Sequence, residues 1–224
     1  QHFDNPDLFD KNWYDLGDIF SSAKSFPIWN DGESYVMSIT AEAQTMFANQ
    51  NMLDSIGAGV PTTFDELLST GKELKSGDVA GVAMRSKADG SAGTWPCGGF
   101  VFSNGGVIIE DGKCLLDSPE AIEAVHYYGT ILKEAGPLGV GNYHWYECLN
   151  DYMQEVSAIG LDSSNFATDI ENPEKSNAAG HTTYGAMVSG PGKQAKPNMW
   201  HWMAGINSKS QQKAAAFLFL TWAN

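Results

Sequence analysis

The segment that decides the fold is "PTTFDELLSTGKELKSGDVAGVAM", residues 61–84, which joins a helix signal to a strand signal. Thr63 and Glu66 stand three apart, the spacing of a capping box, in which each side chain bonds the other residue's backbone. Leucines at helical spacing predict an inward-facing stripe, and Gly77 ends the helix. The stripe consists of Leu67, Leu68 and Leu74. The apolar run after Gly77, residues 79–84, has the length of a buried strand.

The same mixture of strand and helix signals continues along the chain. Residues 34–39, "SYVMSI", alternate as a strand does. Residues 107–117, "VIIEDGKCLLD", place Asp-Gly between two apolar runs, which predicts a two-residue hairpin. Buried strands are also predicted at residues 157–161 and 184–188. Strands that alternate with helices and hairpins indicate an α/β fold with mixed sheets.

A long helix is predicted over residues 117–136. Asp117 or Ser118 would cap it, and Pro119 suits its first turn. Apolar residues recur at helical spacing and predict the stripe that faces the core. This stripe consists of Ile122, Val125, Tyr128 and Leu132. A shorter helix is predicted over residues 146–154.

The last predicted helix starts at Ser208, with Gln211 in the capping-box position, and continues through "KAAAFLFLTW", residues 213–222. Because this run is apolar on nearly every side, we expect the helix to be buried between other elements. The run is too short to cross a bilayer.

The composition limits the kinds of partner. The chain has 224 residues, with 27 acidic and 13 basic side chains and a formal net charge of -14. A nucleic-acid partner would need a basic stripe, and the sequence contains none, so no nucleic acid is expected. Repulsion between acidic surfaces keeps a protein soluble and monomeric. This role is a sufficient explanation of the negative charge.

The three cysteines, Cys97, Cys114 and Cys148, form no C-x-x-C pair, so neither a metal site nor a disulfide framework is indicated. We expect all three to be small buried hydrophobic residues in the thiol form. A bridge from Cys97 to Cys148 is the alternative in an oxidising compartment.

Motifs for cofactor or nucleophile chemistry are missing from the sequence. It contains no Walker loop, no G-x-G-x-x-G that opens a helix and no G-x-S-x-G elbow, so no cofactor is expected. His144 and Glu147 have the spacing of a polar helix start, and a metal pair there would lack further ligands. The carboxylates of Glu42, Glu147 and Asp162 leave open an acid–base pair of the glycosidase type.

Four tryptophans lie in or beside loops, where binding residues gather. They are Trp95, Trp145, Trp200 and Trp202. Trp200 and Trp202 flank His201, so a strand would place both rings on one face. Aromatic rings stack on the C–H faces of sugars, while charged and amide groups bond the hydroxyls. Burial in the core is the alternative for each ring, because tryptophan side chains are on average largely buried.

Several longer segments, in order along the chain, are similar to one protein family. They include "GVPTTFDELLSTGKELKSGDVAGVAMR", "GTWPCGGFVFSNGG", "YHWYE", "FATDIENPEKS" and "WHWMAGINSKSQQKAAAFLFLTWA". The set resembles the extracellular solute-binding proteins of ABC importers for sugars and polyols, the maltose-binding-protein-like family 1. The resemblance covers nearly the whole chain.

The resemblance implies a two-lobed periplasmic-binding-protein (type II) fold, an α/β fold with mixed sheets flanked by helices. It assigns residues 42–186 to lobe 2, and residues 1–41 and 187–224 to lobe 1. The family's opening βαβ units and its closing helices have no counterpart in this sequence. The first lobe is therefore expected to be incomplete in this chain.

The resemblance and the position of each residue also imply a set of ligand-binding side chains. The set is Glu42, Arg85, Trp95, Trp145, Asp162, Asn165, Trp200 and Trp202. Trp202 matches the family's tryptophan at this point. Trp200 stands where relatives have glycine, so it is expected to narrow the cleft. Arg85 ends the predicted strand and is expected to bond ligand hydroxyls.

The implied function is capture of a sugar or polyol in a cleft between the lobes, followed by delivery to the membrane permease subunits of an ABC importer. We expect such a protein in the periplasm, or extracellular and membrane-tethered, as a monomer without catalysis, metal or cofactor. One alternative is a carbohydrate-active hydrolase that uses Glu42 and Asp162 as its carboxylate pair. The other is a scaffold that recognises a protein through exposed aromatic residues.

Overall fold

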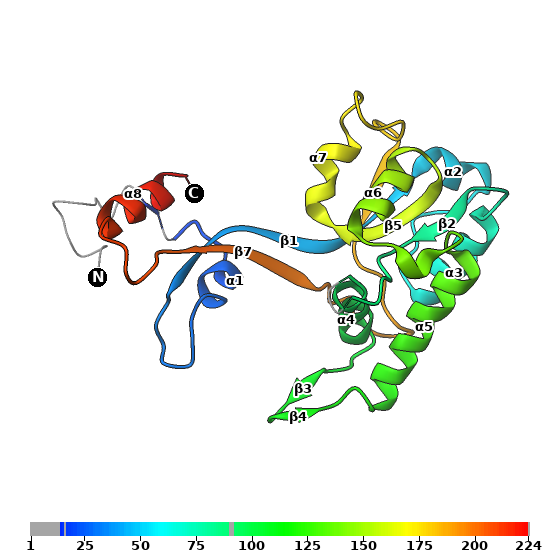
Figure 1. Cartoon of the computed structure of the whole chain (residues 1–224). Helices are drawn as coiled ribbons and strands as arrows, with labels where there is room; N and C mark the ends of the chain where they lie inside the picture. Colours follow the sequence, from blue (N-terminus) through cyan, green and yellow to red (C-terminus); the bar gives the residue numbers. More distant parts are fainter. Residues whose placement is uncertain (1–13, 16, 90–91, 224) are drawn as a thin grey trace. The chain divides into compact units, whose positions relative to one another are not determined.

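The computed structural model describes residues 14–15, 17–89 and 92–223 (Figure 1). The chain forms two compact units. The larger unit is Ala43–Asn198, and the smaller unit holds the residues before and after it.

The larger unit ends at Asn198, beyond the predicted boundary at residue 186. Met187 and Val188 are buried in its core. Ser189 forms a bridge with Thr63 at the start of a helix in the same unit. These contacts hold the segment after residue 186 in the larger unit.

The larger unit is built on a mixed sheet with strand order β2-β5-β1-β6. These strands are β1 (Val36–Asn49), β2 (Ala80–Ala83), β5 (Ser157–Ser163) and β6 (Thr182–Gly185). Strand β7 (Met199–Gly205), which belongs to the smaller unit, also pairs with β1. β2 is parallel to β5, whereas β1 is antiparallel to both β5 and β6. In this register Gln44 stands opposite Ser163, so the end of β5 lies beside the point where β1 enters the larger unit.

Helices flank the sheet of the larger unit (Figure 1). They are α2 (Gln50–Ser55), α3 (Phe64–Leu74), α4 (Thr94–Ser103), α5 (Pro119–Ala135), α6 (Trp145–Met153) and α7 (Ala167–Ile170), with 3-10 turns η1 (Val140–Asn142) and η2 (Ser164–Phe166). The smaller unit holds α1 (Ser21–Ser25) and α8 (Lys213–Ala223).

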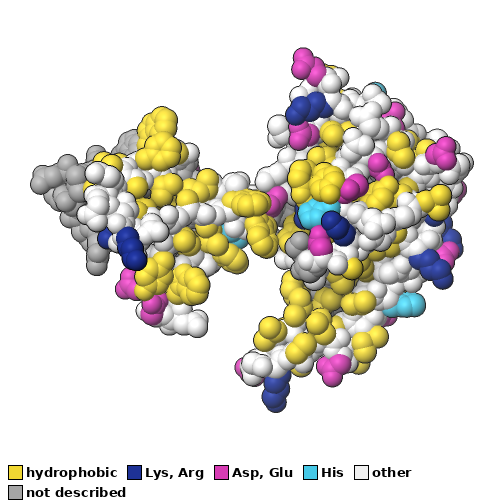
Figure 2. Space-filling view, in the orientation of Figure 1, with side chains coloured by type: hydrophobic (Ala, Val, Ile, Leu, Met, Phe, Trp, Pro, Cys, Tyr) yellow, Lys and Arg dark blue, Asp and Glu magenta, His cyan; other side chains and the backbone are white. Residues whose placement is uncertain are grey.

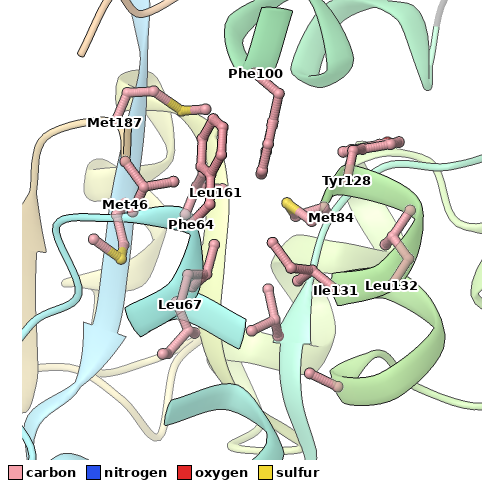
Figure 3. Close-up of a cluster of buried hydrophobic side chains, with 14 of the residues drawn as sticks. Met46, Phe64, Leu67, Met84, Phe100, Tyr128, Ile131, Leu132, Leu161 and Met187 are labelled. Carbon is pink, nitrogen blue, oxygen red and sulfur yellow. The ribbon is translucent and has the colours of Figure 1, made fainter. Parts of the chain in front are cut away.

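The central part of the sheet, which consists of β2, β5 and the last residues of β1, is buried on both faces. Along β1, Met46 and Ala48 belong to one apolar cluster, while Phe47 belongs to a second cluster with Tyr152 of α6. In the first cluster, rings from α3, α4 and α5 meet around the end of β2 (Figure 3). Phe64 stacks on Phe100 with centroids 4.8 Å apart. Burial on both faces explains why the strand at residues 157–161 is a continuous apolar run.

Two local predictions are confirmed. The capping box of α3 is present: Thr63 Oγ1 accepts from Glu66 N at 3.2 Å, and Glu66 Oε2 accepts from Thr63 N at 3.3 Å. The hairpin at residues 107–117 forms strands β3 (Ile109–Glu110) and β4 (Lys113–Cys114). Asp111 and Gly112 both have positive φ, as a type I′ turn requires.

The predicted buried stripe of α5 is partly wrong. Tyr128 and Leu132 are buried, but 58% of Ile122 and 45% of Val125 are exposed. Helix α5 packs against α3, α4 and β2 through three alanines together with Tyr128, Ile131 and Leu132. The buried alanines are Ala121, Ala124 and Ala135. Hydrophobic side chains consequently reach the surface near the hairpin and the start of α5 (Figure 2).

Two strands differ in extent from the prediction. β1 continues well past residue 39, because its second half is the buried centre of the sheet. β6 lies earlier than residues 184–188 and ends at Gly185, after which the chain leaves the sheet. The apolar residues that follow are buried in the core but belong to no strand. An apolar run alone does not distinguish a buried strand from a buried loop.

The prediction for α8 is wrong in two respects. The helix begins at Lys213 rather than Ser208, and Ser210 Oγ accepts from Gln212 N just before it. Among the described residues of α8 only Thr221 is buried, while 61% of Phe219 and 70% of Trp222 are exposed. An apolar helix has side chains that other elements could bury. The described residues of the smaller unit cover few of those side chains. Within the described residues, no helix combines the length and apolar character required to span a membrane.

All three cysteines are free thiols, so the alternative Cys97–Cys148 bridge is not formed. Cys148 is buried and Cys97 partly buried, but Cys114 is exposed on β4, contrary to the prediction of three buried residues. Burial raises the pKa of both the Cys97 and the Cys148 thiol.

We expect one thiol of the three to react rapidly with Ellman's reagent at pH 8 in the folded protein. The thiolate is the reactive form, so burial and a raised pKa slow Cys97 and Cys148. Colour release measured with and without urea tests this, and Cys114→Ser should remove the fast phase. Two fast thiols in native buffer would contradict the protection of either Cys97 or Cys148.

Candidate functional site

Arg85 and Asp162 form a bidentate ion pair in the larger unit. Arg85 follows the end of β2, and Asp162 lies near the end of β5, the parallel neighbour of β2. Arg85 Nε and Nη2 donate to the two carboxylate oxygens at 2.7 and 2.5 Å, and Ser163 N donates to one of them at 2.7 Å. The Asp162 side chain is 1% exposed and that of Arg85 16%. The pair is therefore largely desolvated, with the arginine nearer to solvent.

Two further elements hold Arg85. The ring of Trp95, in the first turn of α4, lies 4.9 Å from Arg85 Cζ, within the range of a cation–π contact. The Tyr128 hydroxyl of α5 donates to the backbone oxygen of Arg85. Burial raises the pKa of Tyr128, which keeps this donor protonated. Strands β2 and β5 and helices α4 and α5 thus fix a single cation.

The start of α6 is built as a helix cap. His144 Nδ1 accepts from Trp145 N at 2.8 Å, and Glu147 Oε2 accepts from His144 N at 2.8 Å. This confirms the predicted polar helix start. Both side chains of the alternative metal pair are used by the cap. No group of three or more potential metal ligands occurs among the residues that the structure describes.

The α6 cap presents exposed aromatic rings. Trp145 is 41% and Tyr146 49% exposed, with centroids 5.5 Å apart. Phe166 of η2 lies 5.9 Å from Trp145, and Asn165, beside it, is exposed. The sequence analysis named Trp145 and Asn165 as candidates but not Tyr146 and Phe166. Each of these two rings directly follows a named candidate in the sequence, which is the signal that could have identified it.

A second aromatic group lies in the smaller unit, on β7. Trp200 and Trp202 are 49% and 56% exposed, whereas His201 between them is 6% exposed. The predicted strand with both rings on one face is confirmed, since their centroids lie 6.2 Å apart. His201 instead stacks on Phe26 at 4.6 Å.

Glu42 holds one of these two rings. Trp202 Nε1 donates to Glu42 Oε1 at 2.8 Å. Glu42 belongs to β1, the strand that pairs with β7, so the bond fixes the Trp202 ring relative to the strand pair. The ring stays exposed although its polar edge is satisfied.

The eight predicted site residues thus fall into three groups. The groups are Arg85, Trp95 and Asp162; Trp145 and Asn165; and Glu42, Trp200 and Trp202. The first two belong to the larger unit and the third to the smaller. Each pairs aromatic rings with polar or charged groups. Such a combination suits a neutral ligand that carries many hydroxyls.

Comparison with known proteins identifies the family. The model for bacterial extracellular solute-binding proteins matches residues 4–224. This chain belongs to that family. The name of the family describes extracellular proteins that bind solutes.

The chain is also similar to curated and solved solute-binding proteins. The chain is 24% identical to the erythritol/L-threitol-binding protein of Mycolicibacterium smegmatis, over 94% of this chain and 47% of that protein. It matches the ABC transporter solute-binding protein of Agrobacterium vitis with bound D-mannitol at a TM-score of 0.84 and 22% identity, covering 94% of this chain and 51% of that one. The corresponding protein of Agrobacterium radiobacter, in complex with ribitol, matches at a TM-score of 0.82 and 24% identity, covering 95% and 54%.

These matches confirm the predicted fold class, the α/β type II periplasmic-binding-protein fold with mixed sheets. The chain spans about half the length of the solute-binding proteins that it matches.

Proposed function

We propose that this protein binds a sugar or polyol and delivers it to the permease subunits of an ABC importer. The observation that carries the proposal is Trp202, an exposed indole ring held in one orientation by Glu42. An exposed tryptophan gains little for the fold, because its apolar face stays in water. A fixed ring beside a carboxylate offers both stacking and a hydrogen-bond acceptor to a hydroxyl-rich ligand.

The charged residues have different parts in this proposal. Arg85 donates to ligand hydroxyls. Its side chain is 16% exposed and that of Asp162 is 1% exposed, so the guanidinium is the charged group of this pair that a ligand can reach. Asp162 orients Arg85 from behind, since its carboxylate is buried and bonded to the guanidinium. The same bonds speak against a hydrolase with Glu42 and Asp162 as acid and base, because Asp162 is already committed to Arg85.

The names of the relatives narrow the ligands to test first. Those bound by or named for the three proteins are erythritol, L-threitol, D-mannitol and ribitol, all open-chain polyols. Flexible polyols present C–H faces to rings and hydroxyls to charged groups, as ring sugars do. Trp145 with Asn165, and Trp200 beside Trp202, supply such contacts in the proposal.

The remaining features of the proposal follow from the family. The larger and smaller units correspond to the two lobes, the smaller one only in part. The protein works in the periplasm or is tethered outside the cell membrane. It acts as a monomer without chemical conversion of its ligand. Its partners are the membrane subunits that accept the ligand.

Replacing Trp202 with alanine is expected to weaken binding by about 1–3 kcal/mol, the contribution of covering a large apolar side chain. The measurement is titration calorimetry with erythritol, ribitol, D-mannitol and maltose, after a thermal-shift screen for the ligand that stabilises the protein. Chromatography of the incubated ligand distinguishes binding from turnover.

Trp222→Ala is the matched control. Trp222 is also an exposed tryptophan of the smaller unit and also contacts a second aromatic ring, Phe219 at 6.0 Å. Its removal should leave affinity unchanged. Equal affinity of the wild type and Trp202→Ala would exclude the ring from the site. Product formation would overturn the binding function itself.

A further inference from the structure

Helix α4 carries two adjacent glycines in its interior, Gly98 and Gly99. Glycine weakens a helix interior, so a pair of glycines there calls for a packing reason. A Cβ atom on Gly99 would overlap the side-chain amide of Gln44, and one on Gly98 would lie 3.2 Å from Asn198 Nδ2. The glycines therefore make room for two amide side chains that come from outside the helix.

Both amides bond the first turn of α4. Asn198 Nδ2 donates to Trp95 O at 2.8 Å, and Gln44 Nε2 donates to Pro96 O at 3.3 Å. The two residues are also joined to each other, because Gln44 N donates to Asn198 O at 2.9 Å. We call these two side chains, with the backbone bond between them, the amide clamp.

The clamp holds the turn that carries Trp95, the ring that lies against Arg85. Gln44 is the second residue of the larger unit and Asn198 its last. The chain thus enters and leaves this unit at the same helical turn. Any displacement of either amide would act directly on the backbone of Trp95.

Gln44 bears a cost that an apolar residue would avoid. Its side chain is 1% exposed, and its Oε1 atom has no hydrogen-bond partner among the described residues. Leaving a buried acceptor unpaired is unfavourable, whereas a methionine of similar shape would fill this space without a polar atom. The amide is useful here only for its N–H donor, which reaches Pro96 O.

We propose that Gln44 and Asn198 are positioning residues that hold Trp95 against Arg85 in the ligand site. The proposal rests on the proposed function, in which Arg85 contacts the ligand. Neither clamp residue need touch the ligand, because both act through the backbone of α4.

The first test needs no ligand. The full chain is labelled with 5-fluorotryptophan, and the Trp95 resonance is assigned with Trp95→Phe. Asn198→Ala and Gln44→Met are each expected to shift or broaden the Trp95 fluorine resonance and to leave that of Trp222 unchanged. Asn198 is partly exposed, so its variant is expected to fold and to carry the test even if Gln44→Met does not. An unmoved Trp95 resonance in the folded variants would overturn the proposal.

The second test measures binding of ribitol and D-mannitol by calorimetry. Each variant should bind roughly fivefold more weakly, the effect of one neutral hydrogen bond. The affinity of the double variant should fall by less than the product of the two single fold-changes, since both residues hold the same helical turn. Exactly multiplicative losses would contradict a shared turn.

Gln154→Met is the matched control. Gln154 Nε2 also donates to a backbone carbonyl in the larger unit, that of Lys175 at 3.2 Å, but on an exposed surface. It should change neither the Trp95 resonance nor the affinity, and an equal loss in this control would overturn the clamp. If the thermal-shift screen finds no sugar or polyol that binds the wild type, the proposed function fails, while the fluorine spectra still decide whether the clamp positions Trp95.

Discussion

Replacing Asp162 with alanine is expected to lower the free energy of unfolding by about 3 kcal/mol. The change leaves the Arg85 guanidinium without its carboxylate in a site where the arginine side chain is only 16% exposed. A mostly buried charge without a partner loses its hydration and gains no compensating bond. The value is set at the low end of the effect known for buried pairs because part of Arg85 reaches solvent. Urea unfolding followed by far-UV circular dichroism measures the change.

The control is Asp169→Ala, which breaks the ion pair between Asp169 and Lys175. Lys175 Nζ lies 2.6 Å from Asp169 Oδ1, a distance similar to those in the buried pair. The side chains of Asp169 and Lys175 are 43% and 57% exposed, however. An exposed pair contributes less than about 1 kcal/mol. Similar losses in the two variants would mean that burial does not determine the strength of the Asp162 pair.

Replacing Gly81 with alanine is expected to destabilise the larger unit by about 3 kcal/mol or more. Gly81 lies in β2, and a Cβ atom there would overlap the backbone carbonyl of Gly71 in α3. Neither backbone can move alone, because α3 also packs on the core through Phe64 and Leu67. Thermal and urea unfolding should both report the loss, and Arg85, four residues further on, should lose ligand affinity with it.

Gly129→Ala is the opposite case in the same unit. Gly129 is exposed in the interior of α5, and a Cβ atom there would meet nothing within 4 Å. Alanine should therefore stabilise the helix by about 0.5–1 kcal/mol. If both glycines tolerated alanine equally, the close approach of α3 to β2 would be wrong.

Local elements followed from the sequence because their determinants are local. The capping box of α3 needs only Thr63 and Glu66, and the hairpin needs only Asp111 and Gly112. The strand alternation of Trp200 and Trp202 is equally local, since period two is a property of the extended backbone. Each of these predictions depends on residues no more than a few positions apart.

Errors arose where the outcome depended on distant residues. Ile122 and Val125 have helical spacing, yet they are exposed because α5 buries the alanine that precedes each of them instead. The apolar run of α8 predicted burial that the described residues of the smaller unit do not supply. Cys114 is exposed because the hairpin that carries it projects from the core. A periodic pattern predicts which residues share one face of an element. Whether that face is buried depends on the other elements that pack against it.

The sequence by itself determined the α/β class, the starts of α3 and α5, the hairpin turn, and the resemblance that the family match confirmed. It also named eight candidate residues, but not their bonds to one another. Only the tertiary structure decided that Asp162 bonds Arg85, that Glu42 bonds Trp202, and that Asn198 bonds the backbone of Trp95. The physical reason is that these partners are 77, 160 and 103 positions apart in the chain, so no local pattern encodes their contact. Strand order and helix packing bring them together.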